Sequence, residues 1–131
     1  MKRILSIDDE PAVLQCLGKL LMRKGYELLL ANNPDKGLQI FKDDTKINLV
    51  LLDIMMPHKD GFQVYREMQS VRHVPALFVT AYPRAFNAES KEMEEMWRKD
   101  FADGMTDIIY KPFDFSTLIE KVESLIGPAG D

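Results

Sequence analysis

The sequence predicts an α/β protein of the doubly wound class, in which helices cover both faces of a parallel sheet. Short apolar runs typical of buried strands alternate with segments whose apolar residues recur at helical spacing. Two of these runs end directly at an acid, Asp8 and Asp53, and sheets of this class bind their ligands at the carboxyl ends of the strands. The 131 residues are enough for one domain with a sizeable core.

Five strands and at least four helices are expected. The strands are expected at residues 4–7, 26–31, 47–53, 74–80 and 108–110. The first helix opens with Pro11 and ends near Gly25, and its apolar stripe comprises Val13, Cys16, Leu17 and Leu20. Asn33-Pro34 caps and opens the second helix, and the turn signal Asp60-Gly61 precedes the third. The last helix runs from about Phe115 to Ile126 and stops at Gly127-Pro128.

Composition and charge exclude several classes of function. The net charge of −4, with no basic stripe, argues against direct binding of nucleic acid. No apolar run approaches the roughly 20 residues that a membrane span needs, and the run before Asp8 is too short for a signal peptide. We therefore expect a cytoplasmic protein. The single cysteine, Cys16, rules out an internal disulfide and is expected to be a core residue.

Three acids are expected to converge at one edge of the sheet. Asp8 and Asp9 end the first strand and Asp53 ends the third, so they meet if these strands are parallel neighbours. Carboxylates brought together next to a core need a compensating cation. Oxygen ligands of this kind favour Mg²⁺, which usually combines one or two carboxylates with waters and a phosphate. The alternative for Asp8 alone is the N-cap of the first helix.

The order of these motifs resembles one known family. The chain carries Asp8-Asp9, then Asp53 with Pro57 and Gly61, then Thr80-Ala81, and finally Lys111-Pro112-Phe113, each group at the end of a successive strand. This series resembles the receiver domain of two-component response regulators, of the type of the chemotaxis regulators. The resemblance covers essentially the whole chain and implies a flavodoxin-like (βα)5 fold with strand order 2-1-3-4-5. It assigns residues 1–127 to the domain and 128–131 to a tail or the start of a linker.

The resemblance also implies a phosphoacceptor and a metal site. Asp53 would take a phosphoryl group from the phosphohistidine of a histidine kinase or phosphotransfer domain, by nucleophilic attack of its carboxylate. Mg²⁺, with Mn²⁺ as an alternative, would be held by Asp9, Asp53 and the backbone carbonyl of Met55, while Asp8 would act mainly through a bound water. Such a module catalyses only its own phosphorylation and dephosphorylation and is otherwise no enzyme.

Two further residues would complete the switch. Lys111 would pair first with Asp53 and later with the phosphoryl oxygens, and the hydroxyl of Thr80 would hydrogen-bond a phosphoryl oxygen. The changed surface would comprise the fourth helix, the fifth strand and the fifth helix. An output domain or downstream protein would bind there, and dimerisation on phosphorylation belongs to the same scheme. The face of the first helix around Leu14 and Leu21 is expected to bind the kinase. The Lys111-Pro112 peptide bond is expected to be cis.

The sequence departs from the family in two places. The aromatic usual three positions before the lysine is here Ile108, while Tyr110 is expected to point away from Lys111. Thr80 and Lys111 stand 31 positions apart, about two helical turns more than is common. The extra residues fall in 82–103, where Asn87 can cap a helix with one apolar face: Met93, Met96, Trp97 and Phe101. This face is expected to pack on the core, and an enlarged partner surface is the alternative.

Two other functions compete with a phosphoacceptor module. A Mg²⁺-dependent phosphohydrolase with an Asp nucleophile usually carries a second acid two residues after it, where this chain has Met55. A flavodoxin-like FMN binder needs a Ser/Thr/Gly-rich phosphate loop after the first strand. Here that loop begins Asp8-Asp9-Glu10, which would repel the FMN phosphate. The phosphoacceptor module fits the sequence best.

Overall fold

The fold is a five-stranded parallel sheet, as the sequence predicts. The computed structural model describes residues 1–81, 95, 97–99 and 105–130. The strands are β1 (Arg3–Ile7), β2 (Glu27–Ala31), β3 (Leu49–Asp53), β4 (Ala76–Thr80) and β5 (Thr106–Tyr110). Their order in the sheet is β2-β1-β3-β4-β5, and every neighbouring pair is parallel. This is the expected order 2-1-3-4-5.

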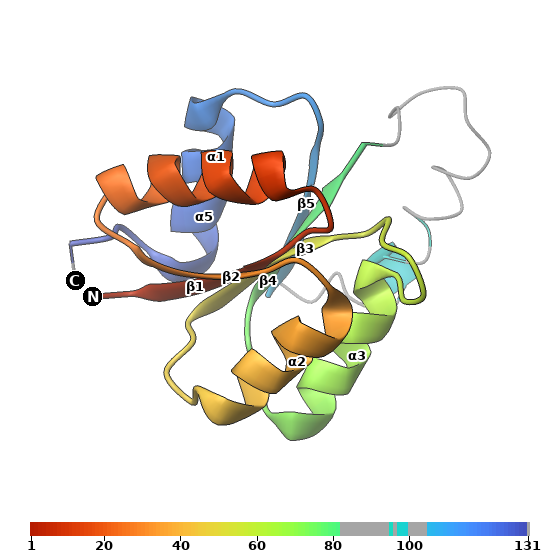
Figure 1. Cartoon of the computed structure of the whole chain (residues 1–131). Coiled ribbons are helices and arrows are strands. Elements are labelled where there is room, and N and C mark those ends of the chain that lie inside the picture. Colours follow the sequence, from red (N-terminus) through yellow and green to blue (C-terminus); the bar gives the residue numbers. More distant parts are fainter. Residues whose placement is uncertain (82–94, 96, 100–104, 131) are drawn as a thin grey trace.

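Helices cover both faces of the sheet. Those with defined bounds in the described part of the chain are α1 (Pro11–Arg23), α2 (Pro34–Asp43), α3 (Gly61–Val71) and α5 (Phe115–Ile126). Figure 1 shows α1 and α5 on one face and α2 and α3 on the other. Each face has its own apolar core, because the side chains of a strand alternate between the two faces. Asn33 and Asp60 cap α2 and α3 through hydrogen bonds to the backbone N–H groups of Lys36 and Gln63.

Some strand boundaries differ from the expected ones by one or two residues. Tyr26, Ile47 and Val74 are buried apolar residues that precede their strands rather than belonging to them. They enter the core from the preceding loops, and a sequence pattern does not distinguish such residues from strand residues. β5 begins at Thr106, two residues earlier than expected, because it pairs with β4 along its full length.

The face that α1 buries differs from the expected one. Its buried residues are Leu14, Leu17, Gly18 and Leu21, whereas Cys16 is exposed. The expectation that Cys16 is a core residue is therefore wrong. The expected kinase-binding face around Leu14 and Leu21 is also wrong, because these side chains are only 5% and 0% exposed. The α1 sequence carries two apolar stripes offset by one residue, which is about 100° around a helix, and the other stripe packs on the sheet.

Both ends of the described chain lie against the domain, near one another (Figure 1). The ammonium of Lys2 donates to the carbonyl of Pro128 at 2.7 Å, and the hydroxyl of Tyr26 donates to the carbonyl of Gly127 at 3.0 Å. Ala129 packs against the core under α1 and α5. The division into residues 1–127 and 128–131 stays a prediction. No helix in the described part of the chain is long and apolar enough to cross a membrane.

Of the expected apolar face in residues 82–103, only Trp97 lies in the described part. It belongs to a helical stretch, is partly buried and packs against the core under α2 and α3. Its indole N–H donates to the hydroxyl of Thr106 at 3.0 Å, at the start of β5. For Trp97 this agrees with packing on the core. The proposed cap Asn87 and the other members, Met93, Met96 and Phe101, lie outside the described residues.

Candidate phosphoacceptor site

Side chains of four strand ends meet at the carboxyl edge of the sheet. Asp53 is the last residue of β3, Thr80 is the last of β4, and Asp8 and Lys111 directly follow β1 and β5. The register pairs Ile7 with Leu52, so Asp8 and Asp53 follow at the same level of neighbouring strands. Asp8, Asp53 and Thr80 are 2%, 4% and 0% exposed. Two buried carboxylates next to one another need compensation by positive charge.

Lys111 supplies part of that positive charge. Its ammonium lies 3.2 Å from Oδ2 of Asp8 and 3.8 Å from Oε1 of Glu10, and these are its ion pairs within the described part of the chain. Burial lowers the pKa of Lys111, but the charges of Asp53 and Asp8 outweigh this and raise it above its ordinary value. The expected pairing of Lys111 with Asp53 is therefore a longer-range attraction here, and the direct partner is Asp8. The Lys111-Pro112 peptide bond is cis, as expected.

The carboxyl group of Asp53 is held in an unfavourable place for a negative charge. Burial, and next the negative charge of Asp8, raise the pKa of Asp53 to about 7. The ammonium of Lys111 and the backbone N–H of Met55, which donates to Oδ1 of Asp53 at 3.2 Å, act in the opposite direction but do not cancel this. Raised pKa values of this kind, in a group with named charged neighbours, are typical of functional sites.

Acidic side chains gather at the start of α1. Oxygens of Asp8, Asp9 and Glu10 lie within 4.8 Å of one another, close enough to share one ion, so the donor set fits a hard cation such as Mg²⁺. Oδ1 of Asp8 accepts the backbone N–H of Glu10 at 2.9 Å, and the N-cap of α1 is Glu10. The alternative of Asp8 as N-cap is therefore wrong. Glu10 was not among the expected metal ligands, although its place directly after two acids could have indicated it.

The loop after β3 holds Asp53 from the other side. The backbone N–H of Gly61 donates to the carbonyl of Ile54 at 3.0 Å, which brings the start of α3 against the end of β3. A Cβ atom on Gly61 would lie 2.6 Å from the backbone oxygen of Asp53, closer than real contacts allow. Glycine is therefore required at position 61 by the space available. The side chain of Met55 is 47% exposed, beside the site.

We expect Gly61→Ala to lower the free energy of unfolding by about 2 kcal/mol, because the added methyl group overpacks rigid backbone. The matched control is Gly18→Ala, whose Cβ would only contact the side chain of Leu30 at 3.5 Å. That change should raise stability by about 0.5 kcal/mol, since alanine favours helix more than glycine does. Urea unfolding measures both values. Equal effects of the two substitutions would show that the contact with Asp53 is not constraining.

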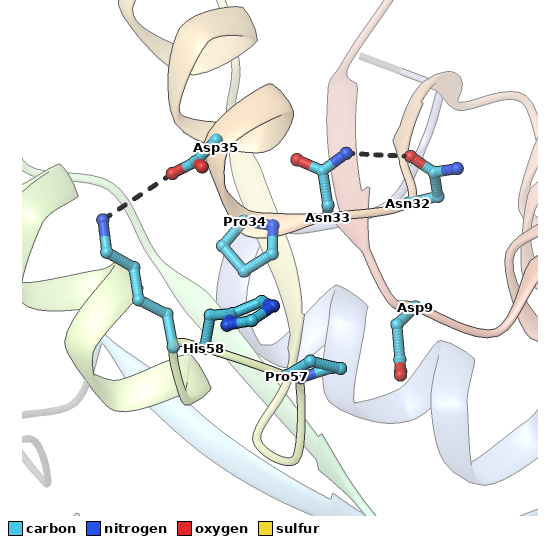
Figure 2. Close-up of a pocket in the computed structure, with 8 residues that line it drawn as sticks. Asp9, Asn32, Asn33, Pro34, Asp35, Pro57 and His58 are labelled. Carbon is cyan, nitrogen blue, oxygen red and sulfur yellow. Dashed lines mark hydrogen bonds and ion pairs between the residues drawn. The ribbon is translucent and has the colours of Figure 1, made fainter.

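A hollow of about 490 Å³ opens beside the acids. Figure 2 shows Asp9 on one side and Pro57 and His58 on another, with Asn32 and Asn33 from the loop before α2 along the rim. His58 is exposed and has a left-handed backbone, with φ of 73°. The exposed carboxylate of Asp9 thus borders open space, whereas that of Asp8 is buried.

The positions of Ile108 and Tyr110 follow strand alternation. Both pack in the core under α2 and α3, and Ile108 is 6% exposed. Tyr110 pairs with Thr80 in the register, and the backbone N–H of Lys111 donates to the carbonyl of Thr80 at 2.7 Å. β5 therefore links Thr80 and Lys111 directly to the apolar core that Trp97 also contacts.

Sequence comparison places this arrangement among known proteins. A family model described as the response regulator receiver domain matches residues 4–123. Protein PilH of Pseudomonas aeruginosa is 30% identical over 129 residues, which cover 96% of this chain and 98% of PilH. The transcriptional regulatory protein PcoR of Escherichia coli is 33% identical over 127 residues. This match covers 96% of the chain but only 52% of PcoR, and the chain likewise spans about half of several other regulators.

Solved structures agree with the sequence comparison. A CheY-like receiver domain protein from Methanospirillum hungatei has a TM-score of 0.81 at 28% identity, with 96% of this chain and 94% of that chain covered. The response regulator TrrA from Thermotoga maritima, solved in complex with Mg²⁺ and BeF, has a TM-score of 0.75 at 32% identity, with 95% and 99% covered. With its five-stranded sheet, and with the family model matching nearly its whole length, the chain belongs to the response regulator receiver domains.

Proposed function

We propose that this receiver domain is a phosphoacceptor switch in which Asp53 is the phosphorylated residue. The observation that carries the proposal is the buried carboxyl group of Asp53, with its pKa raised to about 7 between Asp8 and Lys111. A carboxylate oxygen of Asp53 attacks the phosphorus of a phosphohistidine. The P–O bond forms while the P–N bond breaks, and the imidazole of the donor leaves.

The site's acids would hold Mg²⁺, with Mn²⁺ as an alternative. Asp9, Asp53 and the backbone carbonyl of Met55 would be direct ligands, while Asp8 would act mainly through a water. The proximity of the oxygens of Asp8, Asp9 and Glu10 supports a cation at this edge. When bound, the ion supplies positive charge that offsets the repulsion between carboxylates and phosphoryl oxygens. TrrA, a relative of known structure, was solved with Mg²⁺ and BeF.

Lys111 and Thr80 would respond to the phosphoryl group. The ammonium of Lys111, now 3.2 Å from Asp8, can pair with phosphoryl oxygens once the charge beside it increases. The hydroxyl of Thr80 lies at the end of the neighbouring strand and can donate a hydrogen bond. Because Thr80 pairs with Tyr110 on β5 and Lys111 directly follows that strand, a shift at the site would pass along β5 toward the expected output surface of the fourth helix, the fifth strand and the fifth helix.

The partners would be a histidine kinase or phosphotransfer domain and, at the changed surface, an output domain or downstream protein. The chain would signal rather than turn over a substrate, and dimerisation on phosphorylation fits the same scheme. A groove between α1 and the β5–α5 loop is the proposed kinase site, because it is apolar and lies next to Lys111. Its lining residues are Ala12, Val13, Cys16, Leu17, Leu20, Lys111, Pro112, Phe113 and Phe115.

The direct test is incubation with acetyl phosphate and Mg²⁺, followed by mass spectrometry of the intact protein. We expect one added phosphoryl group on the wild-type chain, none on Asp53→Asn, and wild-type behaviour of Asp35→Asn. Asp35 is a suitable control because its side chain is 92% exposed and lies on α2. Phosphorylation that persists in Asp53→Asn would refute the assignment.

The two neighbouring acids should contribute unequally to Mg²⁺ binding. We expect Asp9→Asn to weaken Mg²⁺ affinity more than Asp8→Asn, because a direct ligand contributes more than a side chain that acts through water. Loss of a group that acts through water lowers metal affinity by about 10- to 100-fold, and loss of the direct ligand should lower it further. Titration calorimetry at constant pH measures both. Equal affinities of the two variants would contradict the proposed ligand set.

Neither competing function has comparable support. Position 55, two residues after Asp53, holds a methionine rather than the second acid of Asp-dependent phosphohydrolases. The loop after β1 presents carboxylates of Asp8, Asp9 and Glu10, which disfavours the phosphate of FMN.

A further inference from the structure

The edge strand β2 is unusually apolar for its position. In the sheet of the described residues it pairs with β1 only, and its sequence from Glu27 to Ala31 has three leucines in succession. Leu30 is 37% exposed. The carboxylate of Glu27, its one charged side chain, is bound by Arg3 at 2.8 Å. Edge strands are usually protected by free charges, proline or a bulge, and one without them is a template for another strand.

The outward backbone groups of β2 belong to Leu28 and Leu30. The N–H of Glu27 donates to the carbonyl of Lys2 at 2.9 Å, and the carbonyl of Ala31 accepts from the N–H of Asp8 at 3.1 Å. In a parallel pair, alternate residues turn both backbone groups toward the same neighbour. Glu27, Leu29 and Ala31 therefore face β1, and the N–H and C=O groups of Leu28 and Leu30 point to the open edge.

We propose that β2 pairs with β2 of a second copy of this chain, in antiparallel orientation about a two-fold axis at Leu29. In this register Leu28 stands opposite the partner's Leu30, and Leu30 stands opposite the partner's Leu28. Residues with outward backbone groups thus meet each other, so each pair exchanges two main-chain hydrogen bonds. The edge is self-complementary, which a two-fold interface requires. The proposal is independent of phosphorylation.

Apolar side chains flank the paired strands on both faces. On the α1 side, Leu28 lines a shallow hollow together with Met22, which is 62% exposed, and Leu30 lies beside Gly18 of α1. On the α2 side, Leu29 lies beside the half-buried Ile40. In the dimer the apolar side chains of the two copies would meet on each face of the joined sheet. Association would therefore remove one apolar strip from water on the α1 side and one on the α2 side.

Charges on α2 match in the same register. Lys36, Ile40 and Asp43 are spaced i, i+4 and i+7, so they share one face of the helix, and Ile40 in that row lines a hollow together with Leu29, the residue at the proposed axis. The two-fold axis sets the two α2 helices antiparallel. Lys36 then approaches the partner's Asp43, and Asp43 approaches the partner's Lys36. This complementarity favours a second copy over an unrelated extended peptide.

Sedimentation velocity between about 1 µM and 1 mM tests the association. We expect the wild-type chain to dimerise with rising concentration and Leu30→Arg to weaken the dimer about tenfold or more. Val71→Arg is the matched control, because Val71 is also an exposed apolar residue, at 44%, but lies on α3. A wild-type chain that stays monomeric throughout, or a Leu30→Arg chain that dimerises normally, would overturn the proposal.

A charge exchange tests the register itself. Lys36→Asp sets two acids opposite each other and Asp43→Lys sets two lysines opposite each other, so each should weaken the dimer. The double variant restores both attractions and should dimerise as the wild type does. Each single change favours the helix dipole of α2, so unfolding of the helix would not explain a loss. Failure of the double variant to recover would exclude this register.

Discussion

Replacing Asp53 with asparagine is expected to stabilise the metal-free protein at pH 8 by about 3 kcal/mol. Asp53 is 4% exposed and lies beside the buried carboxylate of Asp8, so its ionised form is disfavoured in the folded state. Asparagine keeps the size of the side chain but carries no charge. Loss of the phosphoacceptor and gain of stability should therefore accompany each other, as expected where function requires an unfavourable arrangement.

The direction in which wild-type stability changes with pH follows from the pKa values of Asp53 in the folded and unfolded states. The pKa of Asp53 is about 7 in the folded chain, against about 3.9 for an unfolded aspartate, so the folded state binds more protons between these values. In the wild type, the neutral carboxyl group of Asp53 makes its full contribution to stability below about pH 4. This contribution is lost as the pH rises through about 7. A difference of about three pKa units corresponds to about 4 kcal/mol, and solvent beside the site reduces this.

Urea unfolding with a chelator present, at pH values of about 4.5, 6 and 8, measures the effect. The stability difference between Asp53→Asn and the wild type should be smallest at the lowest pH and grow as the pH rises. Asp35→Asn should show no such growth, because its side chain is 92% exposed. A difference that is independent of pH would mean that the charge of Asp53 is not the cause.

The candidate site was predictable from the sequence because chemistry and chain position coincide there. Asp8, Asp53 and Thr80 each end an apolar run that predicts a buried strand, and a polar group at such a buried position needs a compensating partner. The parallel order of the strands then brings them together without any further information. Asn33 could be predicted as a cap because it precedes the proline that opens α2, whereas Asp60, expected only as part of a turn, also caps α3.

The sequence could not determine which of two similar apolar stripes α1 buries. Leu14 and Leu17 pack on the sheet while Cys16 is exposed, and both stripes are apolar enough to be buried, so the pattern alone does not distinguish them. The direct ion pair of Lys111 with Asp8 was equally unreadable. The long side chain of Lys111 can reach more than one acid, and the sequence does not show that Asp8 is nearer than Glu10.

The orientation of α1 also changes where the kinase is expected to bind. The side chains of Leu14 and Leu21 are buried and cannot contact a partner, whereas Cys16 is exposed in the groove beside Lys111. In the proposed function a phosphohistidine would have to reach Asp53 at the carboxyl edge of the sheet, and this groove borders that edge at Lys111. An apolar helix of the phosphate donor would therefore gain contact area here while its histidine faces the acids.

We expect Cys16→Glu to slow phosphotransfer about 10- to 100-fold from a histidine kinase that phosphorylates the wild-type chain, because a charge in the apolar groove is desolvated on binding. The rate with acetyl phosphate, which needs no docking, should stay unchanged. Met22→Glu is the control, since Met22 is 62% exposed on the same helix but does not line the groove. Transfer at equal rates to both variants would place the kinase elsewhere. Slowing with both donors would instead indicate damage to the phosphoacceptor site, because the groove ends at Lys111.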